Sequence, residues 1–164
     1  MEAMKTTVTP NFKNIISNIG DIGVIRRYFS SYCQYSSRYD NFKTGSVQNA
    51  FNPEFSNGAV MDIGIYTIYP MVVLFGKPLE ISVSGTMLSS GVDGQGAAIF
   101  RYEQMDAVAI YSKIANSYLP SEIQGEDATI SIKDIHNMKE IAVSSGKNTF
   151  DTTWNHNEYI DECY

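Results

Sequence analysis

The chain has 164 residues, a length that suits one domain and is short for two. Apolar residues make up 43% of it and charged residues 18%, which excludes an intrinsically disordered chain. Its net charge of −6, without a basic run, argues against a nucleic-acid or anionic-membrane partner.

The sequence also argues against secretion and membrane insertion. The first residues lack the basic region and apolar core of a signal peptide, and no unbroken apolar stretch approaches the ~20 residues of a membrane span. Two cysteines are too few for a disulfide framework, so we expect a cytoplasmic protein. A single Cys33–Cys163 bridge stays open as an alternative.

The first expected element is a short helix. Thr9 followed by Pro10 is the usual order at a helix start, and Gly20 stands where a glycine often ends a helix. Apolar residues recur between them at helical spacing. The segment Gly23–Ser37 is rich in β-branched and aromatic residues and predicts a long strand, followed by a polar loop to Pro53.

A second, buried helix is expected over Gly58–Phe75, because apolar residues lie on nearly all sides of this segment. Gly64 is unusual inside a helix and indicates a close backbone approach. Pro70 removes a backbone donor and crowds the preceding turn, so we expect a kink or a stop near Tyr69.

The remainder of the chain predicts one strand after another. The expected strands are Ile81–Met87, Ala97–Tyr102, Ala107–Lys113, Ala128–Ile132 and a weaker one over Glu140–Ser144. The last residues resemble the start of another helix. The fold class predicted is therefore α+β: an open, mostly antiparallel sheet with helices on one face, in a single domain over residues 1–164.

The strand Ala107–Lys113 has no clearly polar face, because residues of both alternating sets are apolar. Helices could cover one face. We expect a second copy of the chain on the other, which predicts a homodimer or a higher homo-oligomer.

Asp62 and Tyr66 lie four residues apart on the second helix and therefore share a face. An acidic residue in an apolar helix is costly unless it is paired or faces a polar cleft. We expect the pair to line an open cleft. The alternative is that Asp62 stands near the helix start, favoured by the helix dipole, and that Tyr66 is a core aromatic.

Other candidate motifs are weaker. The glycine-rich segment at residues 91–98 lacks the GxGxxG spacing and a following helix, so it predicts a β-turn. His136 and His156 have no partner at metal-ligand spacing, and no metal site is expected. Cys33 is expected to pack in the core rather than act as a nucleophile.

The segment Phe51–Tyr66, FNPEFSNGAVMDIGIY, resembles the central motif of the glucose–fructose oxidoreductase/inositol dehydrogenase (Gfo/Idh/MocA) family. That motif has a small-residue pair, two apolar residues, Asp-x-Gly-x-His or Tyr, and a further apolar run. Other segments follow in the family's order: Glu2–Pro10, Gly23–Arg26, Gly76–Pro78, Gly91–Asp93, Ile123–Gly125 and Glu158–Glu162. The resemblance covers nearly the whole chain.

In that family an N-terminal Rossmann domain binds NAD or NADP, and a C-terminal α+β domain supplies substrate contacts and the oligomer interface. The chain resembles the second domain alone. It lacks the glycine-rich dinucleotide fingerprint and the family's Glu-Lys-Pro segment, so the resemblance implies a cofactor bound mainly outside these residues. We expect the chain to be an excised domain that is inactive by itself.

Tyr66 stands where most members of the family have His, which resembles the branch of dihydrodiol dehydrogenase and xylose dehydrogenase. The chain departs from that branch at Thr7 and Lys5. The resemblance implies that Tyr66 is the acid/base for hydride transfer between NAD(P) and a sugar or polyol, assisted by the missing domain's Lys. Asp62 would contact the substrate or orient Tyr66. A non-catalytic ligand-sensing or dimerisation module is the alternative function.

Overall fold

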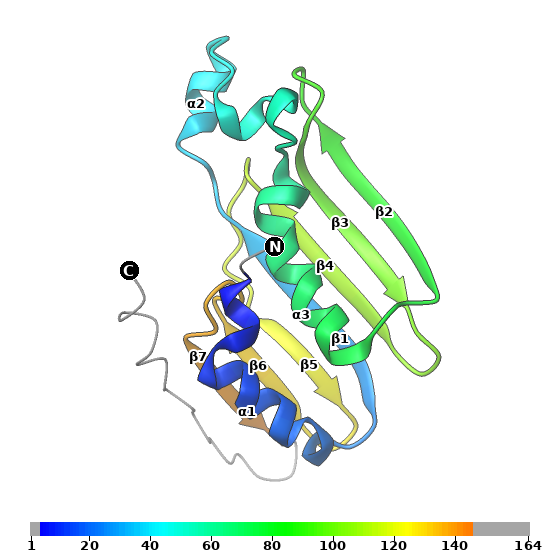
Figure 1. Ribbon diagram of the computed structural model, residues 1–164. Coiled ribbons are helices and arrows are strands. Elements are labelled where there is room, and N and C mark those ends of the chain that lie inside the picture. The colour runs from blue at the N-terminus through cyan, green and yellow to red at the C-terminus, as the bar shows by residue number, and fades with distance from the viewer. Residues whose placement is uncertain (1–3, 146–164) are drawn as a thin grey trace.

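The computed structural model describes residues 4–145 and shows a seven-stranded sheet with helices on one face (Figure 1). The strands are β1 (Ile25–Cys33), β2 (Glu80–Met87), β3 (Asp93–Arg101), β4 (Asp106–Ser112), β5 (Ser121–Gly125), β6 (Thr129–Lys133) and β7 (Glu140–Ser144). Their order is β2-β3-β4-β1-β5-β6-β7. The β1–β4 pair is parallel and the other five pairs are antiparallel. The predicted α+β class and mixed, mostly antiparallel sheet are confirmed.

The helical elements differ in kind. The α-helices are α1 (Pro10–Asn18), α2 (Arg38–Lys43) and α3 (Ile65–Phe75). Four short 3₁₀ turns are η1 (Lys5–Val8), η2 (Ile19–Ile22), η3 (Asn49–Phe51) and η4 (Pro53–Phe55), and a π-helical turn, η5 (Val60–Gly64), leads into α3. Helix α1 lies over β5, β6 and β7, and α3 lies over β1 and β4 (Figure 1). The main core fills the space between these helices and the sheet.

Strand register decides which side chains face the helices. Tyr28, Ala107 and Phe100 are direct cross-strand partners, and all three are buried beneath the helices. The next row, Phe29 and Val108 with their neighbours, points to the opposite face and is only partly buried. Within residues 4–145 no helix covers that face, so the covering partner expected there stays a prediction.

The start of α1 is confirmed, and its end is not where we expected it. The Thr9 hydroxyl accepts the Phe12 N–H at 3.2 Å and caps the helix. The chain does not end its helical path at Gly20 but continues through η2 to Gly23, which has φ +78°. Gly23 therefore ends this helical path, because glycine adopts a positive φ without strain.

The segment after β1 also differs from the prediction. The strand ends at Cys33, whereas we expected it to reach Ser37. The expected polar loop contains the short helix α2 and two 3₁₀ turns. Aromatic side chains of this segment pack around Phe51 in a small cluster, separate from the main core. The polar composition of the segment gave no indication of this cluster.

The helix around Pro70 continues, so the stop expected near Tyr69 is wrong. Helix α3 passes through Pro70 and ends at Phe75. Proline has no backbone N–H, so the helix lacks one hydrogen bond at Pro70. Pro70 and Met71 are buried, and their packing stabilises the helix despite this loss. The irregularity lies earlier, at η5, where the Ile65 N–H donates to the Val60 carbonyl five residues before it.

The close approach inferred for Gly64 is confirmed. A methyl group at Gly64 would lie 3.1 Å from two ring carbons of Tyr111 on β4 and 3.3 Å from Val60. Glycine therefore lets the helix rest directly on the sheet, and this contact sets the height of η5 above the ends of the strands.

The strand predictions hold except for one omission. Strand β5 was not expected, since Ser121–Gly125 is short and carries a weak alternation. The turn expected within residues 91–98 lies earlier in the chain: Gly91, with φ +91°, donates its N–H to the Leu88 carbonyl, and residues from Asp93 onward already belong to β3. The turn is followed by this strand rather than by a helix, as predicted. The C-terminal helix, Cys163 and His156 lie outside the described residues.

The helical run Pro53–Phe75 has 23 residues and a mean hydropathy of 1.6, which would suffice to cross a membrane by length and composition alone. In this structure the run packs across the sheet through Ile63, Thr67 and Met71. A helix that covers a sheet has the same length and composition, so these two properties do not make it a membrane span.

Replacement of Gly64 by valine tests the contact with Tyr111. We expect G64V to lower the free energy of unfolding by about 1–3 kcal/mol, because the added atoms overpack the interface of η5 and β4. Urea unfolding measures the change. The control is G20V, since Gly20 has no atom within 4 Å of an added methyl group. An equal loss in both variants would contradict this role of Gly64.

Candidate functional site

The candidate site lies at the end of the sheet where the parallel strands β1 and β4 both stop. Turn η5 crosses above this end and carries Asp62, and the first turn of α3 carries Tyr66. Tyr32 stands near the end of β1, and Lys113 follows β4 directly. These four residues come from different segments of the chain and lie at the same end of the domain.

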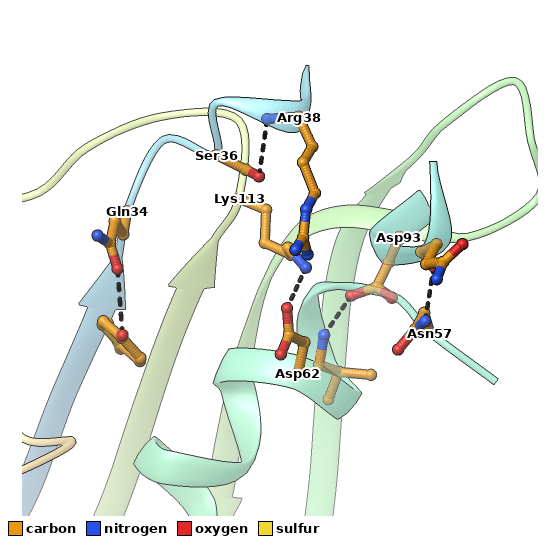
Figure 2. A network of polar contacts seen from close by, with 10 residues as sticks. Gln34, Ser36, Arg38, Asn57, Asp62, Asp93 and Lys113 are labelled. Atoms are coloured by element: carbon orange, nitrogen blue, oxygen red, sulfur yellow. Dashed lines mark hydrogen bonds and ion pairs between the residues drawn. The ribbon is translucent and has the colours of Figure 1, made fainter. Parts of the chain in front are cut away.

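Asp62 forms an ion pair with Lys113, which Figure 2 shows between η5 and the end of β4. The Lys113 side chain is buried, whereas 47% of the Asp62 side chain is exposed. The Lys113 Nζ also lies 5.3 Å from the centre of the Phe51 ring, within the range of a cation–π contact. The carboxylate thus has one side against a buried cation and the other towards solvent.

Tyr66 belongs to an aromatic cluster. Its ring meets Tyr32 edge-on, with centroids 5.8 Å apart, and His136 edge-on at 6.4 Å. The rings of Tyr32 and His136 stack at 4.7 Å and are nearly parallel. Tyr66 is half-buried. Tyr66 is therefore more exposed than an aromatic residue of the core would be.

The electrostatics of the cluster follow from its burial. Burial raises the pKa of Tyr32, and the nearby Tyr66, Asp62 and Asp134 raise it further. The Tyr32 hydroxyl donates to the Gln34 amide oxygen at 3.2 Å, and the Tyr32 ring contacts Tyr66.

Burial lowers the pKa of His136. Lys5 and Lys139 lower it further, and Asp134 opposes them. The imidazole is therefore neutral near pH 7, and it stacks on the Tyr32 ring.

A hollow of about 820 Å³ borders the cluster. Tyr32, Gln34 and His136 contribute to its wall, together with β6, β7 and the loop after Lys113. Asp62 and Tyr66 are not among the described residues that line it. The open cleft expected along these two residues therefore stays a prediction.

The sequence reasoning missed Lys113, Tyr32 and His136 as site residues. Lys113 had a detectable signal, since it ends an apolar strand just as Asp62 interrupts an apolar helix. Two isolated opposite charges in apolar segments indicate that they pair. Over residues 4–145 no three His, Cys, Asp or Glu side chains gather as metal ligands would.

Comparison with known proteins adds a second line of evidence. The family model described as "GFO/IDH/MocA C-terminal domain" matches residues 13–131. The scyllo-inositol 2-dehydrogenase (NADP(+)) IolU of Bacillus subtilis (strain 168) is 56% identical over 143 residues, 87% of this chain and 44% of that protein. The uncharacterized oxidoreductase YgjR of Escherichia coli (strain K12) is 40% identical over 140 residues, 85% of this chain and 43% of the relative. The chain thus spans less than half the length of these curated relatives.

A solved structure shares the fold. Levoglucosan dehydrogenase, in a complex with NADH and levoglucosan, superimposes with a TM-score of 0.78 over 95% of this chain and 47% of its own. The two sequences are 19% identical, so this likeness shows the fold alone.

The lowered pKa of His136 predicts a dependence of stability on pH. As the pH falls below the usual value of 6.5, the unfolded chain binds a proton at this residue before the folded chain does. Stability should therefore fall on acidification. H136F keeps a ring on Tyr32 and removes the titrating group, so we expect a smaller loss between about pH 7.5 and pH 5.5 in urea unfolding. An equal loss in both proteins would contradict the burial of this imidazole.

Proposed function

The chain belongs to the GFO/IDH/MocA C-terminal domain family, and from this we propose that it is the substrate-binding and oligomerisation domain of an NAD(P)-dependent oxidoreductase. Residues 1–164 act in this proposal as one domain of a larger cytoplasmic protein. The observation that carries the proposal is the pairing of Asp62 with a buried lysine beside the half-buried Tyr66.

The substrate class is a polyol or sugar, with a cyclic polyol of the inositol type as the first candidate. The support is the 56% identity to a scyllo-inositol 2-dehydrogenase. The name of that enzyme gives NADP(+) as its cofactor, which is also our first candidate. A polyol offers several hydroxyl groups, and Asp62 presents a half-exposed carboxylate that accepts hydrogen bonds from them.

The dinucleotide has no cradle among the described residues. The glycine-rich segment around Gly91 forms a turn between β2 and β3, not a phosphate loop at a helix N-terminus. We therefore propose that the dinucleotide binds mainly outside these residues. Its site would lie in the part of the intact protein that corresponds to the unmatched part of the relatives. When bound, the nicotinamide supplies hydride transfer.

The residues of this chain would bind the substrate and move a proton. Asp62 accepts a hydrogen bond from one hydroxyl and so fixes which carbon faces the cofactor. The Tyr66 hydroxyl takes the proton from the reacting hydroxyl during oxidation and returns it during reduction. The aromatic cluster of Tyr32 and His136 fixes the Tyr66 ring from the side.

We also propose self-association through the sheet face that the helices leave free. Phe29, Val108 and Ile110 lie on that face, and Ile99 beside them is 52% exposed. Ion pairs between Arg27 and Asp106 and between Arg101 and Glu80 border these apolar residues. An apolar centre with a charged rim is typical of a protein interface.

Replacement of Tyr66 by phenylalanine tests the catalytic role. In the intact protein, we expect Y66F to lower kcat with the polyol by about 10²–10⁴-fold, because it removes the group that transfers the proton. Affinity for NADP(H), measured by fluorescence titration, should not change. Steady-state kinetics with scyllo-inositol and related polyols provide the rates.

The matched control is Y69F, a tyrosine of the same helix that is 38% exposed and lies outside the cluster. It should retain wild-type turnover. Wild-type turnover in Y66F under conditions where chemistry limits the rate would refute the catalytic assignment. Tight NADP(H) binding by residues 1–164 alone would refute the assignment of the domain.

A charge on the free sheet face tests self-association. V108E should convert the oligomer to monomers in sedimentation equilibrium, because an interface of roughly 1,000 Å² or more would bury an unpaired carboxylate. The control is V47E, at an exposed valine in the segment after α2. If V108E stays as associated as the wild type, the interface lies elsewhere.

A further inference from the structure

Lys113 is a buried lysine, and two partners surround its side-chain nitrogen. The residue is 4% exposed, although a lysine is normally buried only with a partner. Asp62 is its ion-pair partner, and the face of the Phe51 ring lies 5.3 Å from the ammonium group. A carboxylate and an aromatic face both stabilise a cation that water does not reach.

The backbone of Lys113 is fixed on two sides. Its N–H donates to the Gly94 carbonyl of β3 at 2.9 Å, and its carbonyl accepts the Ser36 N–H at 2.9 Å. The ammonium group therefore has a rigid base at the end of the sheet. Asp62, in contrast, stands on the irregular turn η5.

Arg38 is another cation drawn in Figure 2, where its side chain extends in the direction of the Lys113–Asp62 pair. It is exposed and belongs to α2, a six-residue helix without buried residues. A solvated side chain on such a helix holds a neighbour less firmly than a buried one does. Lys113 is therefore the cation that can fix the carboxylate.

We propose that Lys113 is a positioning residue, which fixes the Asp62 carboxylate so that its free side receives a hydroxyl group of the polyol. This inference rests on the proposed function. Lys113 itself does not touch the substrate, because it lies behind Asp62 and is buried. A displaced carboxylate would bind the substrate in a wrong orientation, and displacements of about 1 Å can cost about 10²-fold in rate.

The test removes the ammonium group and then returns it. In the intact protein, we expect K113A to lower kcat/KM for the polyol by at least about tenfold while affinity for NADP(H) is unchanged. Added propylammonium, which matches the lost part of the side chain, should restore several-fold activity. Equimolar 1-propanol, of the same size but uncharged, should not. K113R should retain more activity than K113A.

Two further variants separate positioning from general stability. K43M removes the exposed Lys43–Asp40 pair, which also has aromatic neighbours, and should keep wild-type kinetics. In the D62N background, K113A should cost far less in kcat/KM than in the wild type, because the carboxylate that it fixes is gone. Thermal unfolding of each variant shows that the protein is folded.

The outcomes are distinct for the two levels of inference. An intact wild-type protein without NAD(P)-linked activity on any polyol or sugar refutes the proposed function. An active wild type with an equally active K113A refutes the positioning role alone. A loss in K113A that propylammonium does not restore, and that is equal in the D62N background, means that Lys113 acts only in stability and also overturns the inference. If K113A does not fold, K113R and K113M in the two backgrounds give the same comparison.

Discussion

The ion pair between Lys113 and Asp62 joins the two layers of the domain at the site. The lysine belongs to the end of the sheet and the aspartate to the helical layer above it. A buried charge without its partner is strongly unfavourable, by about 3–5 kcal/mol when one member of such a pair is lost. Because Asp62 is half-exposed, the cost for this pair lies below that range. The pair therefore fixes where η5 lies as well as which way Asp62 faces.

The other features of the site depend on the same meeting of layers. Gly64 lets η5 approach Tyr111, and the π-type bond from Ile65 to Val60 shifts the register of the helix at this point. Single π-helical turns within helices occur often at functional sites. Here the turn lies between Asp62 and Tyr66, so it changes the angle between the two side chains from that of a regular helix. Beyond the turn, the Tyr66 ring contacts Tyr32.

Much of the fold could be predicted from the sequence because its signals are local. Alternating residues identified β2, and the cap at Thr9 identified the start of α1. The continuation of the helix through Pro70 could not be predicted, since it depends on packing against strands distant in sequence. Tertiary contacts of this kind override local propensity.

The site was only half visible in the sequence for a similar reason. Asp62 and Tyr66 stand out in one helical segment, whereas Lys113 is 51 residues away from Asp62 and joins it only because η5 packs on β4. His136 comes from the turn before β7 and shows no motif. Its contact with Tyr32 exists only in the folded sheet.

A crystal structure of the intact protein with NADP⁺ and a bound cyclic polyol tests the account most directly. We expect one hydroxyl group of the polyol within about 2.6–3.2 Å of the Tyr66 hydroxyl. A second hydroxyl should lie on the free side of the Asp62 carboxylate, with Lys113 still paired behind it. A polyol that is instead seated among β6 and β7, in the hollow bordered by Ser131 and Glu140, with Tyr66 and Asp62 out of reach, would contradict it.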